Sequence, residues 1–328
     1  MHDLPVRLIR AGCLDPGLTQ GLYHSLAFSM TESSQDTVVL CSPISPYLSI
    51  GYHQIVDSVL NTRICKKLDL PIFRRRIGGG TTYLDHNQIF YQCIFHHSRV
   101  PGRTDRIYQM MLAAPIMVLK KLGLQGNLHS TNELEANGLR IAGIGGGRIG
   151  DAVVVVGNLL IDFNYHVMSQ VWNVPNTYFR ELALVTMQER VGSLKKLGCI
   201  KTTKSLEALL SKAYVECFNR PILESELSQE EIEKGRRTAK YLASGKFLSL
   251  HRPIYSFETM KSLKISAGVF IHNLRLKVKD DEVEIPVRVD KSIIKGFKSN
   301  IDQSQYYKDL LIGTSLSKWK DNSNSKKF

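Results

Sequence analysis

The chain has 328 residues, of which 43% are hydrophobic and 22% are charged. This composition is that of a globular protein with one large or two smaller domains, and it excludes an intrinsically disordered chain. With 43 Lys and Arg against 30 Asp and Glu, the formal net charge is +13. Such a surface favours acidic partners: nucleic acid, anionic lipid or an acidic protein.

The six cysteines are scattered, and no two have the CxxC spacing of a metal or redox motif. We therefore expect reduced, mostly buried thiols, with neither a zinc site nor a disulfide scaffold. No window approaches the ~18 apolar residues of a membrane span. The first residues also lack the apolar core of a signal peptide, which favours a soluble, cytoplasmic protein.

Short elements are predicted in the first seventy residues. Residues 4–9 are typical of a strand, and residues 16–30 have helical spacing, with Asp15 as the predicted N-cap and Pro16 at the first helical position. The pattern then predicts two strands and one amphipathic helix, at residues 38–40, 47–51 and 54–68.

Residues 73–95, FRRRIGGGTTYLDHNQIFYQCIF, carry the most informative pattern. Three arginines precede three glycines, and an alternating apolar strand follows. Consecutive glycines let the backbone approach a ligand, and their N–H groups can form a concavity for an anion. Arginine binds carboxylate and phosphate with two parallel donors. The residues alone leave two interpretations open: a cradle for a small anion, or a flexible hairpin turn with solvated arginines.

The later elements suggest a second module. A long helix is predicted over residues 102–124, buried strands over 153–156 and 159–163, and helices between 177 and 218. Composition changes near Ser228, which has the capping-box spacing to Glu231. Alternation over residues 262–290 predicts two or three antiparallel strands with a turn at Asp280 and Asp281. We expect a small C-terminal module after about residue 225.

Several blocks, taken in chain order, resemble the superfamily of lipoate–protein ligase and biotin–protein ligase catalytic domains. RRRIGGGTTYLD at residues 74–85 resembles the lipoate family signature RRxxGGGxxYhD and is the most specific block. The other similar blocks are SIGYHQ (49–54), TNELEANGLRIAG (131–143), VGNLLIDFN (156–164) and ERVGSL (189–194). Residues after Ser228 resemble, more loosely, the accessory domain of lipoate–protein ligases.

The resemblance implies an α+β fold. We expect a central mixed, largely antiparallel sheet flanked by helices, and a small C-terminal accessory α+β domain. The expected boundaries are residues 1–225 for the catalytic domain, 226–315 for the accessory domain, and 316–328 for a basic flexible tail. That tail has four lysines between Lys318 and Lys327.

The resemblance also implies a two-step reaction. The carboxylate of lipoate, or of octanoate, attacks the α-phosphorus of ATP in the presence of Mg²⁺ and gives an acyl adenylate. The amine of a lysine on an acceptor lipoyl domain then attacks the adenylate and releases AMP. The acceptor is expected to be acidic, of the glycine-cleavage H-protein type or the E2 type, which would explain the basic surface. Neither nucleic acid nor a membrane is expected as a partner.

The family's site residues can be carried onto this sequence. The expected lipoate-binding residues are Arg75, Arg76, Gly78, Gly79, Gly80 and Tyr83. The expected nucleotide- and magnesium-binding residues are Asn132, Glu133 and Arg148, with Glu133 as the metal ligand. The expected catalytic residue is Arg140.

The adenylate-forming half departs from the family pattern. Arg140 stands where the family has its signature lysine, and the two side chains differ in size and donor geometry. A glycine run ending at Arg148 replaces a short Ser/Ala- and Arg-containing loop, and Val156 replaces a histidine.

These departures leave alternatives open. The protein could be an acyltransferase that moves octanoyl or lipoyl groups between carriers, but no cysteine stands at the place such an enzyme needs, and Cys93 is expected to be a buried strand residue. It could instead bind lipoate or a lipoyl domain without chemistry. Biotin ligation is the runner-up substrate, although the biotin family's GRGRxxR loop is absent and RRRIGGG stands in its position.

Overall fold

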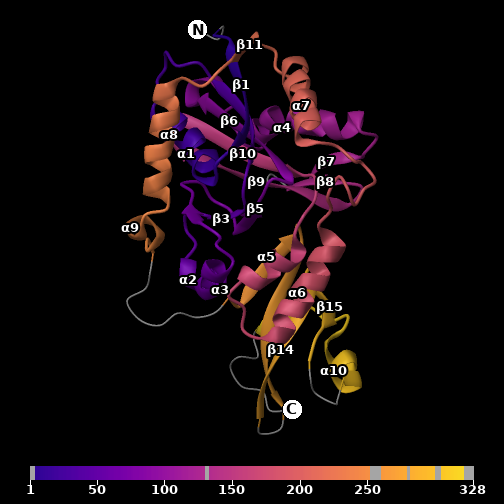
Figure 1. Ribbon diagram of the computed structural model, residues 1–328. Helices are drawn as coiled ribbons and strands as arrows, with labels where there is room; N and C mark the ends of the chain where they lie inside the picture. The colour runs from indigo at the N-terminus through magenta and orange to yellow at the C-terminus, as the bar shows by residue number, and fades with distance from the viewer. Residues whose placement is uncertain (1–3, 130–132, 252–259, 279–280, 300–303, 321–328) are drawn as a thin grey trace. The chain divides into compact units, whose positions relative to one another are not determined.

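The structure is a computed structural model in which the chain forms two compact units (Figure 1). It describes residues 4–129, 133–251, 260–278, 281–299 and 304–320. The first unit comprises Met1–Val56, Cys65–Phe163 and Gly192–Arg252. The second unit comprises Asp57–Ile64, Asn164–Val191 and Pro253–Phe328.

An eight-stranded mixed sheet forms the centre of the first unit, in the order β11-β1-β2-β6-β10-β9-β8-β7. Its strands are β1 (Val6–Leu14), β2 (Thr37–Pro43), β6 (Gln88–His96), β7 (Gly126–His129), β8 (Glu133–Ala136), β9 (Leu139–Ile149), β10 (Ala152–Leu160) and β11 (Ile222–Ser225). β1 pairs in parallel with β2 and β11, and the other neighbours pair antiparallel. The predicted mixed, largely antiparallel sheet is confirmed.

Helices cover both faces of this sheet (Figure 1). α4 (Thr104–Lys121) and α7 (Thr203–Cys217) pack on one face, and α1 (Pro16–Phe28) packs on the other. Because side chains alternate along a strand, β2 sends Leu40 to the first core and Val39 to the second. The other helices of the first unit are η1 (His97–Arg99), α8 (Gln229–Leu242) and α9 (Gly245–Leu248). The short helices α2 (Val56–Val59) and α3 (Thr62–Lys67) include residues of the segment Asp57–Ile64, which belongs to the second unit.

α8 belongs to the first unit, so the units do not divide at the predicted boundary near residue 225. The physical reason is close packing between α1 and α8: a Cβ at Gly21 would lie only 2.0 Å from the carbonyl oxygen of Gly235. α8 begins with the predicted capping box, in which Ser228 and Glu231 exchange side-chain-to-backbone hydrogen bonds. The capping box therefore stabilises the first turn of α8, and the contact with α1 holds the helix against the first unit.

The helix predicted over residues 54–68 is wrong in its length, because two short helices, α2 and α3, stand there. Leu60, between them, forms a β-bridge with Trp172. The Asn61 side chain then accepts a hydrogen bond from Ile64 N (3.2 Å) and starts a new helix. The apolar periodicity of this segment did not reveal the interruption.

A small sheet carries the glycine-rich stretch. Its order is β4-β3-β5, with β3 (Tyr47–Ile50) parallel to β4 (Ile72–Arg74) and antiparallel to β5 (Thr82–Leu84). Residues 75–81 connect β4 to β5, and we call them the glycine loop.

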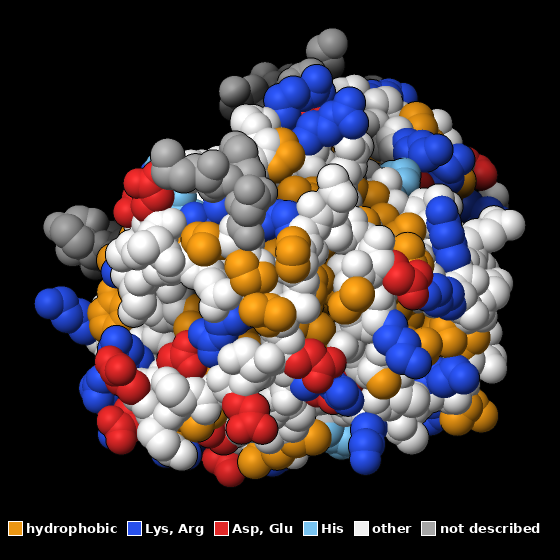
Figure 2. Space-filling model, turned by 90° about the horizontal axis from the view of Figure 1, so that it is seen from above, with side chains coloured by type: hydrophobic (Ala, Val, Ile, Leu, Met, Phe, Trp, Pro, Cys, Tyr) orange, Lys and Arg blue, Asp and Glu red, His pale blue; other side chains and the backbone are white. Residues whose placement is uncertain are grey.

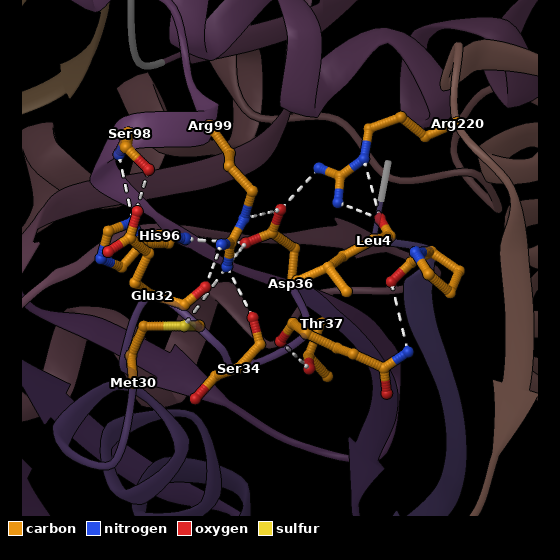
Figure 3. A network of polar contacts seen from close by, with 12 residues as sticks. Leu4, Met30, Glu32, Ser34, Asp36, Thr37, His96, Ser98, Arg99 and Arg220 are labelled. Atoms are coloured by element: carbon orange, nitrogen blue, oxygen red, sulfur yellow. Dashed lines mark hydrogen bonds and ion pairs between the residues drawn. The ribbon is translucent and has the colours of Figure 1, made fainter. Parts of the chain in front are cut away.

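Asp36, just before β2, is fully buried and joins three segments of the first unit (Figure 3). Its carboxylate accepts hydrogen bonds from Arg99 Nε and Nη2 (both 2.9 Å), Arg220 Nη1 (2.5 Å) and His96 N (2.8 Å). Arg99 also donates to the Ser34 carbonyl (2.6 Å). The buried charge is thus paired on both oxygens, as burial requires.

The second unit is a small α+β unit, as predicted. Its four-stranded sheet has the order β12-β13-β14-β15, with every neighbouring pair antiparallel. Its elements are β12 (Ser262–Ser266), β13 (Val269–Val278), β14 (Asp281–Asp290), β15 (Ile293–Phe297), α5 (Tyr165–Val171), α6 (Thr177–Arg190), α10 (Ser304–Leu311) and α11 (Ser317–Lys320). α6 packs on the sheet and pairs with it through Arg190 and Asp290 (2.6 Å).

The expected flexible tail does not begin at residue 316. Leu316 and Trp319 are buried in the core of the second unit, and Trp319 Nε1 donates to Thr314 Oγ1 (2.8 Å). An aromatic side chain within the lysine-rich segment explains the difference, because it buries enough apolar area to hold α11. Residues 321–328, and the predicted turn residue Asp280, lie outside the described residues. None of the described helices is long and apolar enough to cross a membrane.

Candidate active site

The glycine loop is shaped by close backbone approaches. Gly79 has a φ of +105°, a conformation that favours glycine. A Cβ at Gly79 would lie 2.7 Å from Arg75 Nη2, and a Cβ at Gly51 would lie 1.9 Å from the Gly79 carbonyl oxygen. A Cβ at Gly78 or Gly80 would meet no described heavy atom within 4 Å. Gly79 and Gly51 therefore fix the loop, and Gly78 and Gly80 offer open backbone.

Arg75 supports this loop from the inside. Its side chain is buried, with Nη2 donating to the carbonyl oxygens of Gly80 (2.6 Å) and Gly78 (3.1 Å). Nη1 donates to the carbonyl and hydroxyl oxygens of Ser49 (3.1 and 3.3 Å). Burial lowers the pKa of the guanidinium from its ordinary value. These bonds make Arg75 a support of the loop, and its predicted contact with lipoate stays a prediction.

A buried polar network continues from Arg75 into α1. Ser49 Oγ donates to Gln20 Oε1 (3.3 Å), and Gln20 Nε2 donates to the Tyr47 hydroxyl (2.8 Å). The Tyr47 hydroxyl also hydrogen-bonds to Thr19 Oγ1 (2.9 Å). Each of these side chains is buried, so their bonds constrain one another and hold Arg75 in one position.

The other two arginines of the run point to different neighbours. Arg74 is fully buried and donates to the backbone carbonyls of Tyr52 (2.7 Å) and Phe247 (2.8 Å). Arg76, predicted to bind lipoate, donates to the Tyr241 hydroxyl (2.8 Å) and lies over three aromatic rings. The structure therefore gives each arginine a separate environment.

Glycines of β9 face the glycine loop. A Cβ at Gly145 would lie 3.2 Å from Ile77 Cδ1 and 3.3 Å from the Gly78 carbonyl oxygen, and one at Gly147 would lie 3.3 Å from Ile77 Cγ2. Gly146 faces the other way, where a Cβ would lie 2.4 Å from the hydroxyl of a tyrosine of α4. Glycines on both faces of β9 let the loop approach the sheet on one side and the helix approach it on the other.

Arg140, Glu133, Asn158 and Thr82 meet around Gly143. A Cβ at Gly143 would lie 3.4 Å from Arg140 Nη2, 3.4 Å from Asn158 Oδ1 and 4.0 Å from Thr82 Cγ2. Gly143 is also the direct partner of the buried Glu133 across the β8–β9 pair. Burial lowers the pKa of the Arg140 guanidinium, and the Glu133 charge partly offsets that shift. The structure thus brings together two predicted site residues beside β5.

Asn158 and Gln88 were not predicted as site residues, yet they hold this region in place. Asn158 Oδ1 accepts a hydrogen bond from Gly143 N (3.0 Å), and Asn158 Nδ2 donates to Gln88 Oε1. Gln88 Nε2 donates to the Tyr83 carbonyl oxygen (3.1 Å). The available signal was the polar residue Asn158 between two apolar runs of the sequence, since a buried strand amide needs a partner.

Tyr83 and Arg148, two further predicted site residues, lie apart from the residues that meet around Gly143. Tyr83 is buried, with its ring 6.4 Å from that of Phe163, and burial raises the pKa of its phenol. Arg148 alternates with Gly147, so it lies on the face of β9 opposite the glycine loop. Its Nε donates to the Gly150 carbonyl (2.9 Å). Asn132, the third predicted nucleotide-binding residue, lies outside the described residues.

Three cysteines of the chain, Cys41, Cys65 and Cys93, are buried, whereas Cys13 on β1 is exposed. Cys93, the strand cysteine, is fully buried, and burial raises the pKa of its thiol to about 12. Its Sγ lies 3.5 Å from the Tyr214 hydroxyl, on the α4 and α7 side of the sheet. Burial also raises the pKa of the Cys41 and Cys65 thiols.

The first unit thus combines a mixed sheet with helices on both faces, a glycine loop and a glycine-rich strand. The sequence pattern of the lipoyl protein ligase A/B catalytic domain matches residues 18–213. The chain belongs to this family of lipoate ligase-like enzymes.

Similar proteins agree with this assignment. "Probable lipoate-protein ligase A" of Mycoplasma pneumoniae is 24% identical over 228 residues, which are 69% of this chain and 66% of that protein. The chain therefore spans just under two thirds of that relative.

Two solved structures share the fold. One is a bi-partite lipoate protein ligase of Thermoplasma acidophilum, studied with its E2 lipoyl domain, with a TM-score of 0.68 and 17% identity over 77% of this chain and 100% of that one. The other is a lipoate-protein ligase A bound with ATP, with a TM-score of 0.64 and 17% identity over 75% of this chain and 99% of that one.

Proposed function

We propose that this protein activates lipoate, or octanoate, with ATP and transfers the acyl group to a lysine of an acceptor lipoyl domain. The observation that carries the proposal is the arrangement of the glycine loop, which offers open backbone at Gly78 and Gly80. The loop leads into β5, whose Thr82 lies beside Gly143 of β9, where Arg140 and Glu133 meet. Membership of the lipoyl protein ligase family and the ATP-bound relative support it.

In the first step, a carboxylate oxygen of the acyl substrate bonds to the α-phosphorus of ATP, and the bond to pyrophosphate breaks. Arg140 is the cation that stabilises the charge developing on the phosphate oxygens. In the second step, the neutral amine of the acceptor lysine attacks the acyl carbon, and the bond between that carbon and the AMP oxygen breaks. AMP leaves with the bonding electrons, and the amine nitrogen releases a proton to solvent. The glycine loop N–H groups orient the carboxylate in the first step and the acyl carbonyl of the adenylate in the second.

Glu133 is a suitable ligand for Mg²⁺. Magnesium is commonly held by one or two carboxylates together with water and substrate phosphates, so a single buried glutamate fits this chemistry. No cluster of three or more His, Cys, Asp or Glu that could enclose a metal occurs in the described part of the chain. When bound, the ion would neutralise phosphate charge.

Exchange of labelled pyrophosphate into ATP tests the first step. The wild-type protein should show exchange that requires lipoate. Arg140→Ala should lower the exchange rate by about 10²–10³-fold, because it removes a donor aimed at developing charge. Arg140→Lys should retain part of the rate, since it keeps the charge and loses the planar geometry.

Arg103→Ala is the control for Arg140→Ala. It also removes one arginine charge, but from an exposed ion pair with Asp105 (2.9 Å) outside the predicted site. It should leave the exchange rate within about twofold of wild type. Lipoate binding without any exchange in the wild-type protein would instead identify a binding protein and end the ligase proposal.

An acyltransferase that uses a thioester remains the second candidate, and burial disfavours Cys93, the strand cysteine, as its nucleophile. Such an enzyme needs a thiolate, whereas burial raises the pKa of the Cys93 thiol to about 12. Acyl transfer that survives replacement of all six cysteines by serine would exclude this mechanism.

The acceptor is proposed to be an acidic lipoyl domain. The net charge of the chain is +13, and Figure 2 shows Lys and Arg side chains spread over one face with fewer Asp and Glu between them. Charge of this kind mainly raises the rate of encounter with an acidic partner and is screened by salt. The T. acidophilum relative, studied with its E2 lipoyl domain, supports a lipoyl-domain acceptor.

A further inference from the structure

Arg74 is a fully buried cation that joins two segments far apart in the sequence. Nε donates to the Phe247 carbonyl (2.8 Å), and Nη2 donates to the carbonyls of Leu248 (2.8 Å) and Leu250 (3.1 Å). Nη1 donates to the Tyr52 carbonyl (2.7 Å). The planar guanidinium therefore donates hydrogen bonds from one edge to the end of α9 and from Nη1 to the loop after β3.

Arg74 supplies donors at the end of α9, where the Phe247 carbonyl also accepts a hydrogen bond from Leu250 N (3.3 Å). The last carbonyls of a helix have no partner within the helix, and α9 ends at Leu248. The loop after β3 includes Gly51, whose Cβ position lies 1.9 Å from the Gly79 carbonyl oxygen. A shift of α9 relative to this loop would therefore be passed to Gly79 and the glycine loop.

The segment that carries α9 is itself anchored to the first unit. α8 packs against α1 at backbone contact between Gly21 and Gly235. Arg76, two residues after Arg74, donates to Tyr241 Oη at the end of α8 and lies 5.6 Å from the centre of the Phe247 ring. Alternate arginines of the run thus bind residues 241–250, and Arg75 between them binds the glycine loop.

We propose that residues 229–250, α8 and α9, are a positioning element of the active site, and that Arg74 is the positioning residue that couples them to the glycine loop. The inference rests on the proposed function for its kinetic consequence only. Arg74 touches no substrate in this account; its effect on lipoate binding runs through Tyr52, Gly51 and Gly79.

Arg74→Lys is the direct test, in the full-length protein. A lysine keeps the charge but cannot span both sets of carbonyls. Amide hydrogen exchange in residues 51–54 and 75–81 should become about tenfold faster, as expected for the loss of a few hydrogen bonds to a charged group. The KM for lipoate should rise about tenfold, and kcat should change less.

Arg99→Lys is the matched control, because Arg99 is also a buried arginine that donates to several oxygens, within the Asp36 network. It should lower the melting temperature without changing exchange in the glycine loop or the KM for lipoate. Equal changes in the two variants would mean that Arg74 only stabilises the fold, and the proposal would be overturned.

A milder pair of variants covers the case in which Arg74→Lys does not fold. Ser244→Ala removes the N-cap of α9, where Ser244 Oγ accepts from Phe247 N (3.3 Å). Ser228→Ala removes the N-cap of α8, at the other end of the segment. Ser244→Ala should accelerate exchange in the glycine loop and Ser228→Ala should not.

Amide hydrogen exchange is measured without lipoate or ATP. The coupling through Arg74 and the ligase function are therefore tested by independent measurements. Unchanged loop exchange in Ser244→Ala, with α9 itself loosened, would refute the coupling even if the enzyme is a ligase. Absence of pyrophosphate exchange in the wild-type protein would refute the ligase function and leave the coupling result standing.

Discussion

The three glycines of the loop have different physical roles, although the sequence presents them as equals. Gly79→Ala combines a φ of +105° with a Cβ 2.7 Å from Arg75 Nη2. It should destabilise the protein by about 1–3 kcal/mol in urea unfolding. Gly78→Ala is the control: its Cβ enters open space, so its unfolding free energy should stay within about 0.5 kcal/mol of wild type. Equal losses in the two variants would contradict the loop geometry.

His24 gives the first unit a dependence on pH. The ring is fully buried, its Nδ1 donates to the Gln20 carbonyl (2.6 Å), and its Nε2 accepts from Arg76 N (2.9 Å). Burial lowers the pKa of His24 to about 3. Between that pH and the unfolded value near 6.5, the unfolded chain binds a proton that the folded protein does not. Stability should therefore fall as the pH drops through this window.

Unfolding in urea at pH 7 and pH 5 tests this account of His24. Linkage gives a loss of roughly 2 kcal/mol at pH 5 from this one group. His24→Gln keeps a donor and an acceptor but does not titrate, so the difference between the two pH values should shrink by about that amount. An unchanged difference would show that His24 is not the group responsible.

Sequence reasoning at the residue scale singled out the glycine loop, Arg140 and Glu133 as site candidates, and the structure brings Arg140 and Glu133 together around Gly143. It did not predict that the three arginines of the run have different partners. The motif placed Arg75 and Arg76 together near substrate. In the structure, Arg75 bonds to loop carbonyls and Arg76 to Tyr241. The partner of Arg76 is 165 residues away in the sequence, and no local pattern encodes such a contact.

At the scale of elements, the Asp36 network fixes how β2, β6 and β11 are joined at one end of the sheet. Asp36→Asn should destabilise the first unit by about 3–5 kcal/mol, because it leaves Arg99 and Arg220 without a full counter-charge in a buried place. Thermal unfolding followed by circular dichroism measures this. Asp151→Asn, at an exposed ion pair with Arg148, is the control and should change stability by less than about 1 kcal/mol.

Local signals predicted element boundaries well where a cap or a glycine stands. Asp15 caps α1 by accepting from Leu18 N (2.9 Å), as predicted. The helix over residues 54–68 was wrong because its interruption at Leu60 is caused by a strand bridge to Trp172, over a hundred residues later. The spacing of apolar residues predicts which side chains are buried, but it does not predict which distant segment they pack against.

At the scale of the whole molecule, the sequence predicted two α+β parts but not how the chain is distributed between them. Residues 164–191 join the second unit because α6 packs on the β12–β15 sheet. Residues 229–248 join the first unit because glycines allow α8 to approach α1. Chain order suggested a single boundary, whereas each unit takes segments from both sides of it.

We propose that this chain uses ATP to form an amide between lipoate and an acceptor lysine. Mass spectrometry of a purified lipoyl domain, incubated with the protein, lipoate and ATP, tests it most directly. We expect a mass gain of one lipoyl group on a single lysine, which depends on ATP and is largely lost in Arg140→Ala. A gain without ATP from an acylated carrier, or no gain while lipoate still binds, would contradict it.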